Sequence, residues 1–263
     1  VLTGPKMRNQ QIVLIGIGEI GGVFARGFLR LGYSVHPVTR ETDMQALAQD
    51  VPSPSLVVVA VGEQSLPPLL SEIPDAWRNR LCLLQNELLP KDWQDIDQPT
   101  VISIWFEKKP GMDAKVIIPS PIYGPGSELV CTALEAVGIA CQRLNSEAEL
   151  LQELVIKNLY ILTSNIAGLE CGGTVDSLWR EQRELASAVA ADVLTLQEAL
   201  TGQRFDRDLM IGRMLEAFAG DPDHKCMGRS APARLARALE HAEGFGLSLS
   251  TLERIAEQTR AVS

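Results

Sequence analysis

A single lysine interrupts an apolar stretch that has helical spacing. The segment ELLQELVIKNLYILTSNIAGL, residues 149–169, repeats apolar residues with the period of a helix, and Lys157 lies between Ile156 and Leu159 on its apolar face. An ammonium partly removed from water releases its proton more readily, so this lysine suits a proton donor. The alternative is a lysine whose stem covers apolar surface while its ammonium reaches water.

Two asparagines could act with this lysine. Asn86 ends the apolar segment LLQN, and Asn165 follows Lys157 by about two helical turns, on roughly the same side. Ligands of open α/β sheets bind beyond the carboxyl ends of the strands, so Asn86 is expected to face that crevice. The alternatives are a turn residue for Asn86 and a helix-interior residue bonded to backbone for Asn165.

Three glycines near the N-terminus form the pattern GxGxxG. Gly16, Gly18 and Gly21 follow an apolar run and open a helix-like stretch, which is the setting of a dinucleotide-binding turn. The first glycine permits the tight turn, the second admits a pyrophosphate, and the third lets the helix pack on its strand. The predicted cofactor contacts in this turn are Gly16, Ile17, Gly18, Glu19, Ile20 and Gly21. A tight turn without a ligand is the alternative.

The residues after the second expected strand select the cofactor. The sequence there is PVTRE, where NAD sites usually carry an acidic residue for the ribose hydroxyls. Arg40 can hold a 2′-phosphate by charge-assisted hydrogen bonds, and Thr39 precedes it. Glu41 competes and would favour NAD. We predict NADP, with Thr39 and Arg40 as contacts, because Arg40 comes first after the strand.

Elements that could position these residues alternate in the first half of the chain. Continuous β-branched runs such as SLVVVAVG are typical of parallel strands covered on both faces. Alternation of strands and helices predicts a doubly wound, Rossmann-type parallel sheet. The expected strands are 11–15, 34–38, 55–62, 80–86, 100–106 and 114–119, and the expected helices are 20–31, 43–49 and 65–73.

After about residue 145 the pattern becomes helical throughout. Ser146 followed by Glu149 has the form of a capping box. We therefore predict a dinucleotide-binding domain at 7–145 and an all-helical domain for substrate binding and dimerisation at 146–263. Its expected helices are 146–168, 181–200, 206–219, 232–243 and 250–261. Met7 is a candidate native start.

Composition narrows the class of protein. The chain has 263 residues, 46% of them apolar, and a net charge of -9, so a nucleic-acid partner is not expected. The apolar runs are strand-sized, which predicts no membrane span. Five scattered cysteines fit a reducing cytoplasm better than a disulfide scaffold, and three separated histidines argue against a metal site. We expect a small-molecule substrate and leave a homodimer open.

These motifs together resemble the ketopantoate reductase (2-dehydropantoate 2-reductase) family. The likeness rests on GIGEIGG, the arginine after the second strand, QN after the fourth, and the lysine helix with its later asparagine. It implies a Rossmann domain followed by a helical domain, an active site between them, and NADPH-dependent reduction of a 2-keto acid. By this resemblance Lys157 is the catalytic proton donor, Asn86 orients substrate and nicotinamide, and Asn165 binds substrate.

The second half departs from the family pattern. The family commonly has another asparagine one turn after the lysine, where this chain has Ile161. Cys226 stands where a substrate-contacting serine is usual, and no acidic residue occurs from Gly228 until Glu240, with Ser230 or a gap at the expected position. The resemblance therefore indicates a divergent reductase with a different substrate.

Two classes of function remain. The first is an NADPH-dependent reductase of a small carbonyl compound, with a relative that reduces an imine or oxidises a hydroxy acid as a near variant. The second is a non-catalytic, NADP-binding redox sensor. Lys157 and Asn86 favour the enzyme, whereas Ile161 and the missing acid favour the sensor.

Overall fold

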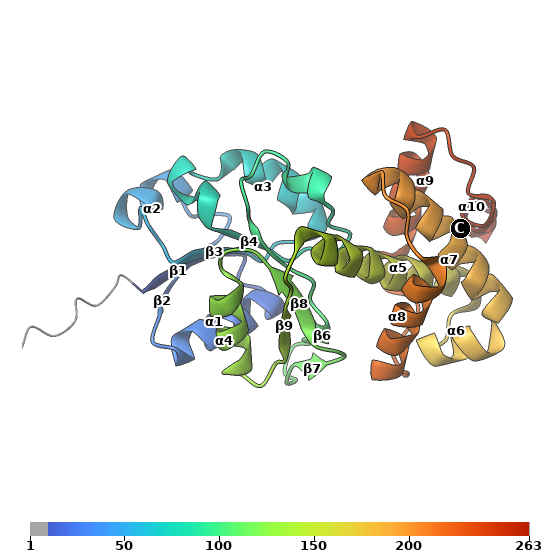
Figure 1. The fold of residues 1–263 in the computed structure, drawn as a ribbon, viewed down its shortest axis with the longest axis horizontal. Helices are drawn as coiled ribbons and strands as arrows, with labels where there is room; N and C mark the ends of the chain where they lie inside the picture. The colour runs from blue at the N-terminus through green and yellow to red at the C-terminus, as the bar shows by residue number, and fades with distance from the viewer. Residues whose placement is uncertain (1–9, 263) are drawn as a thin grey trace, which may run out of the picture. The chain divides into compact units, whose positions relative to one another are not determined.

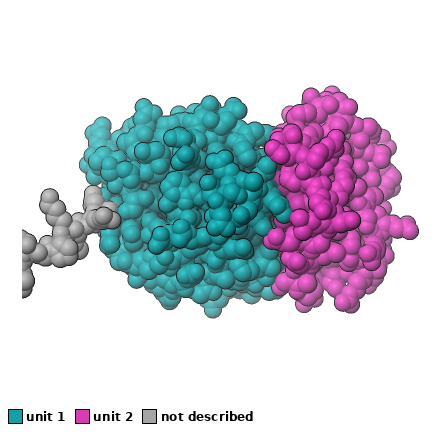
Figure 2. Space-filling model, in the orientation of Figure 1, with its two compact units in different colours: residues 1–153 teal, residues 154–263 magenta. Residues whose placement is uncertain are grey.

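The computed structural model describes residues 10–262. The chain divides into two compact units, residues 1–153 and 154–263, coloured separately in Figure 2. The division falls within helix α5 (Glu147–Cys171), so the predicted boundary near residue 145 remains a prediction. Met7, the candidate start, lies outside the described residues.

Unit 1 is built on a seven-stranded sheet. Its first five strands run parallel, as predicted. β1 pairs with β2 on one side and with β3 on the other, so the strand order reverses at β1. In spatial order the strands are β2 (Ser34–Val38), β1 (Gln11–Ile15), β3 (Leu56–Val59), β4 (Leu81–Leu83), β5 (Thr100–Ile102), β8 (Ser120–Tyr123) and β9 (Cys141–Arg143). The crevice at such a reversal is where α/β sheets bind ligands.

Helices cover both faces of this sheet, which explains its apolar central strands. Figure 1 shows α1 (Glu19–Arg30) and α4 (Ser127–Glu135) on one face, with α2 (Met44–Asp50) and α3 (Leu66–Glu72) on the other. α1 packs so closely on α4 that a Cβ at Gly27 would overlap the carbonyl of Ala133. Three short 3₁₀ helices complete the unit: η1 (Glu63–Ser65), η2 (Asp75–Arg80) and η3 (Pro90–Trp93).

One predicted strand does not belong to the main sheet. The range 114–119 was expected in the main sheet, but Lys115–Val116 forms β7, which pairs with β6 (Phe106–Glu107) in a separate two-stranded hairpin. The main sheet is completed instead by β8, antiparallel to β5, and by β9. The fold class itself, a mostly parallel sheet followed by helices, is confirmed.

Unit 2 is helical. Besides most of α5 it holds α6 (Val175–Glu181), α7 (Arg183–Thr201), α8 (Arg207–Gly220), α9 (Ala231–Gly244) and α10 (Ser250–Val262). α5 starts where expected, because the Ser146 hydroxyl accepts a hydrogen bond from the Glu149 N–H at 3.2 Å. It ends before Gly172 and Gly173, both at positive φ. Among helices of residues 10–262, none is long and apolar enough to span a bilayer.

Candidate functional site

The glycine turn has the geometry that a pyrophosphate requires. Gly16 has a φ of 91°, and a Cβ there would lie 2.6 Å from the carbonyl oxygen of Ala60, so only glycine fits. A Cβ at Gly21 would overlap the carbonyl of Gly16, which lets α1 start directly against β1. At Gly18, the N-cap of α1, a Cβ would meet nothing within 4 Å.

Open space at Gly18 adjoins the positive end of the α1 dipole. Because glycine carries no side chain, no capping oxygen from this residue covers the first N–H groups of α1. A helix N-terminus of this kind binds anions such as phosphate. The residues present therefore fit the pyrophosphate of a dinucleotide. Ile17, Gly18 and Glu19 are exposed, and Ile20 is half-buried.

The turn after β2 lies next to the glycine turn. The Gly16 N–H donates to the carbonyl of Val38 at 3.1 Å, so the carboxyl ends of β1 and β2 are side by side. A tight turn follows, in which the Thr42 N–H donates to the carbonyl of Thr39 at 3.2 Å. Its two central residues, Arg40 and Glu41, are both exposed. The geometry offers a cation and an anion to the same region.

Asn86 lies in a turn directly beyond β4. The preceding Gln85 is buried, and its amide Nε2 donates to the carbonyls of Val59 at 2.6 Å and Val61 at 3.2 Å. These bonds tie the carboxyl end of β4 to that of β3 after the strand ladder stops at Leu83. Glu87 adopts a φ of 62°, which closes the turn. Asn86 is therefore held, half-buried, at the carboxyl edge of the sheet.

Lys157 is half-buried on α5. Its ammonium lies 5.6 Å from the ring centroid of Tyr160, one helical turn later, a cation–π arrangement that stabilises positive charge. The adjacent Asn158 is buried and donates to Gln197 of α7 at 2.9 Å. This bond ties α5 to α7 at the residue next to Lys157.

Asn165 meets a residue that sequence reasoning missed. Its side chain is 7% exposed, and its Oδ1 accepts a hydrogen bond of 2.9 Å from the guanidinium of Arg234 on α9. A Cβ at Gly228 would lie 3.7 Å from the same oxygen. Unit 2 thus brings Asn165, Gly228 and Arg234 together. The side chain that meets Asn165 in this chain is a guanidinium.

Cys226 packs directly on the lysine helix. A Cβ at Gly168 of α5 would lie 2.8 Å from the backbone carbon of Cys226, so the DHKCM segment follows the helix closely just past Asn165. The thiol is buried, and burial raises its pKa to about 12. Cys226 therefore stays protonated at neutral pH and is a weak nucleophile. Ser230, the other residue considered for this region, is exposed before α9.

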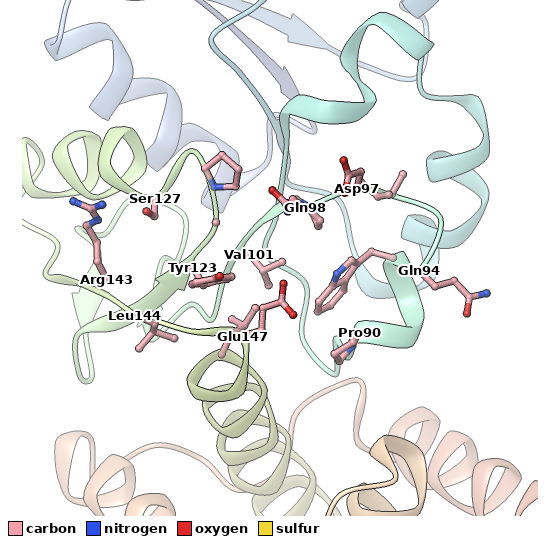
Figure 3. Close-up of a pocket in the computed structure, with 16 residues that line it drawn as sticks. Pro90, Gln94, Asp97, Gln98, Val101, Tyr123, Ser127, Arg143, Leu144 and Glu147 are labelled. Carbon is pink, nitrogen blue, oxygen red and sulfur yellow. The ribbon is translucent and has the colours of Figure 1, made fainter.

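A separate cavity of about 660 Å³ lies in unit 1 (Figure 3). It opens among η3, the amino end of β5, the carboxyl ends of β8 and β9, and the start of α5, with Trp93, Tyr123, Arg143 and Glu147 in its lining. Because it is at the amino end of β5, it is at the opposite end of that strand from the dinucleotide crevice. None of the residues predicted for cofactor, substrate or proton transfer lines it.

Comparison with solved structures identifies the architecture. No protein-family model and no curated protein sequence matches the chain. A 2-dehydropantoate 2-reductase from Methylococcus capsulatus superposes with a TM-score of 0.69 over 96% of each chain, at 12% identity. The chain has the fold of ketopantoate reductase. The resemblance inferred from the motifs is confirmed at the level of the fold.

Two further structures show how widely this fold is shared. A dimeric ketopantoate reductase from Staphylococcus aureus matches with a TM-score of 0.64 over 95% of this chain and 98% of that one, at 16% identity. D-mandelate dehydrogenase in complex with NADH matches with a TM-score of 0.65 over 96% and 98%, at 12% identity. The ketopantoate reductase fold therefore serves more than one substrate.

Proposed function

We propose that the protein is an NADPH-dependent oxidoreductase that reduces a small 2-keto acid to the 2-hydroxy acid. The observation that carries this proposal is the glycine turn, where Gly16 and Gly21 are sterically required and Gly18 leaves open space at the N-terminus of α1. Similar folds in ketopantoate reductases and in an NADH-bound mandelate dehydrogenase support a nicotinamide cofactor and a 2-keto or 2-hydroxy acid substrate.

In this proposal three side chains act on the substrate: Lys157, Asn86 and Asn165. When bound, the reduced nicotinamide supplies a hydride to the carbonyl carbon. Lys157 donates a proton to the carbonyl oxygen, so that an alcohol forms and no free alkoxide has to leave the site. Asn86 orients the carbonyl, and Asn165 binds the substrate. The half-buried Lys157 lies beside Tyr160, with its Nζ 5.6 Å from the ring centroid.

The cofactor prediction is tested at Arg40. Replacing it with alanine should weaken NADPH binding about ten- to hundredfold, because a charge-assisted bond to the 2′-phosphate is lost. NADH carries no such phosphate, so its affinity should change little. Titration calorimetry with both nucleotides measures the two dissociation constants. If Arg40→Ala lowers the affinity for both nucleotides equally, the assignment is contradicted. If Glu41→Gln lowers the affinity for NADH alone, Glu41 holds the ribose and NAD is the cofactor.

Arg234 favours an anionic substrate. Its guanidinium reaches Asn165 and can pair with a carboxylate by two parallel hydrogen bonds. Arg234→Met, which keeps the apolar stem, should therefore raise KM for a 2-keto acid about tenfold or more while the dissociation constant of NADPH stays unchanged. Steady-state kinetics on the active substrate measures this split. An unchanged KM would mean that Arg234 only supports Asn165.

A redox sensor is the second candidate, favoured by Ile161 and by the absence of an acidic residue from 228 to 239. The two candidates differ in turnover. Absorbance at the nicotinamide band, followed with a panel of straight, branched and aromatic 2-keto acids, should show NADPH consumption for at least one member. Tight NADPH binding with no consumption across this panel, or with a second panel of imines, would favour the sensor. We keep a homodimer as an expectation, testable by light scattering.

A further inference from the structure

An ion pair covers the start of α1, and one partner comes from a distant part of unit 1. Lys108 Nζ lies 2.9 Å from Oε2 of Glu19, the first residue of α1, and also donates to the carbonyl of Lys109 at 2.8 Å. The lysine side chain is 17% exposed, whereas that of Glu19 is 43% exposed. Two hydrogen bonds thus hold this ammonium beside the glycine turn.

The position of Lys108 is fixed by the core. β5 ends at Ile102, and the chain then passes through Trp105 and Phe106, both buried, before it reaches the lysine. The Ile117 N–H donates to the carbonyl of Trp105 at 2.8 Å, and Phe106 pairs with Val116 across the hairpin. Because β5 is parallel to β1, its carboxyl end opens at the same edge as the glycine turn.

Glu19 creates a conflict of charge at this edge. A carboxylate in the first turn of a helix interacts favourably with the helix dipole. A pyrophosphate bound at the same helix end carries two negative charges and is repelled by that carboxylate. The ammonium of Lys108 removes this repulsion and offers a donor of the right charge for a phosphate oxygen.

We propose that Lys108 is a pyrophosphate-binding residue of this chain. In the free protein Glu19 holds the ammonium in place. When a dinucleotide binds at the glycine turn, Lys108 donates to a phosphate oxygen, and Glu19 competes for the same ammonium. The proposal rests on the proposed dinucleotide function and adds to it a residue from the β6–β7 hairpin and a carboxylate that limits affinity.

A double-mutant cycle tests this, with NADPH binding measured by calorimetry and no substrate present. Lys108→Met should weaken binding about ten- to hundredfold, the worth of a charge-assisted phosphate contact. Glu19→Gln should strengthen it about two- to fivefold, since only a partly exposed, screened repulsion is relieved. The double variant should bind about tenfold or more weakly than Glu19→Gln alone. Lys108→Arg should keep most of the affinity.

Lys109→Met is the matched control, because this neighbouring lysine is 67% exposed and pairs with Glu107 rather than with the turn. It should bind NADPH within about twofold of wild type. If the double variant binds as tightly as Glu19→Gln, Lys108 only neutralises Glu19 and the proposal is wrong. If the wild-type protein binds neither NADPH nor NADH, the proposed function is overturned together with this inference. If Gly18→Val loses binding but Lys108→Met has no effect, only this inference is overturned.

Discussion

Lys157→Ala should lower turnover with the best 2-keto acid by about 10²–10⁴-fold, the usual contribution of a positioned general acid. The dissociation constant of NADPH should stay nearly unchanged, because Lys157 belongs to unit 2 and the glycine turn to unit 1. Lys157→Arg should not restore full turnover, since a guanidinium holds its proton too tightly to donate it. Steady-state kinetics together with calorimetry measures both quantities.

Two controls separate chemistry from folding in this test. Lys157→Met keeps an apolar side chain of similar length at this half-buried position, so it should fold like the wild type and still lose turnover. Lys91→Ala, at an exposed lysine of η3, should leave turnover within about twofold. If both Lys157 variants keep wild-type turnover, Lys157 is not the proton donor and its ammonium only reaches water.

Gly18→Val should abolish dinucleotide binding while the fold survives. A Cβ at this position meets nothing within 4 Å, so the side chain is accommodated in the free protein. The same open space is where the backbone must approach the pyrophosphate, so the branched side chain excludes it. Calorimetry with NADPH should show no measurable binding, and circular dichroism should show an unchanged spectrum and melting temperature within a few degrees.

Other glycines of α1 provide matched controls. Gly22 is exposed with open space around its Cβ position, so Gly22→Ala should retain NADPH binding and gain about 0.5–1 kcal/mol of stability from helix propensity. Gly21→Ala should instead destabilise the fold, because the added carbon overlaps the carbonyl of Gly16. Wild-type affinity in Gly18→Val would mean that no dinucleotide lies across this turn.

The dinucleotide half was readable from the sequence because its signals are local. Gly16, Gly18 and Gly21 follow an apolar strand within a few residues. Gly16 and Gly21 are required by their close backbone neighbours, and Gly18 leaves open space at the start of α1. Asn86 could be placed at the edge of the sheet by the same local logic. Its partner Gln85 was not assigned a role, because its bonds reach β3 and depend on register.

Long-range contacts could not be read in this way. Lys108 meets Glu19 across 89 residues of sequence, because the segment after β5 forms the β6–β7 hairpin. The sequence of residues 114–119 did not indicate that this segment lies outside the main sheet. Arg234 on α9 reaches Asn165 on α5 across 69 residues of sequence. Helix α4 was also missed, since GPGSELVCTALE is short and begins with turn residues.

The central claim, NADPH-dependent reduction of a 2-keto acid, is tested most directly by the stoichiometry of product and cofactor. Wild-type protein is incubated with NADPH and the most active member of the 2-keto acid panel, and the 2-hydroxy acid is quantified by mass spectrometry against the NADP⁺ formed. We predict one 2-hydroxy acid for each NADP⁺, and no product with Gly18→Val. Absence of a hydroxy acid with every panel member, while wild-type protein binds NADPH, would contradict the account.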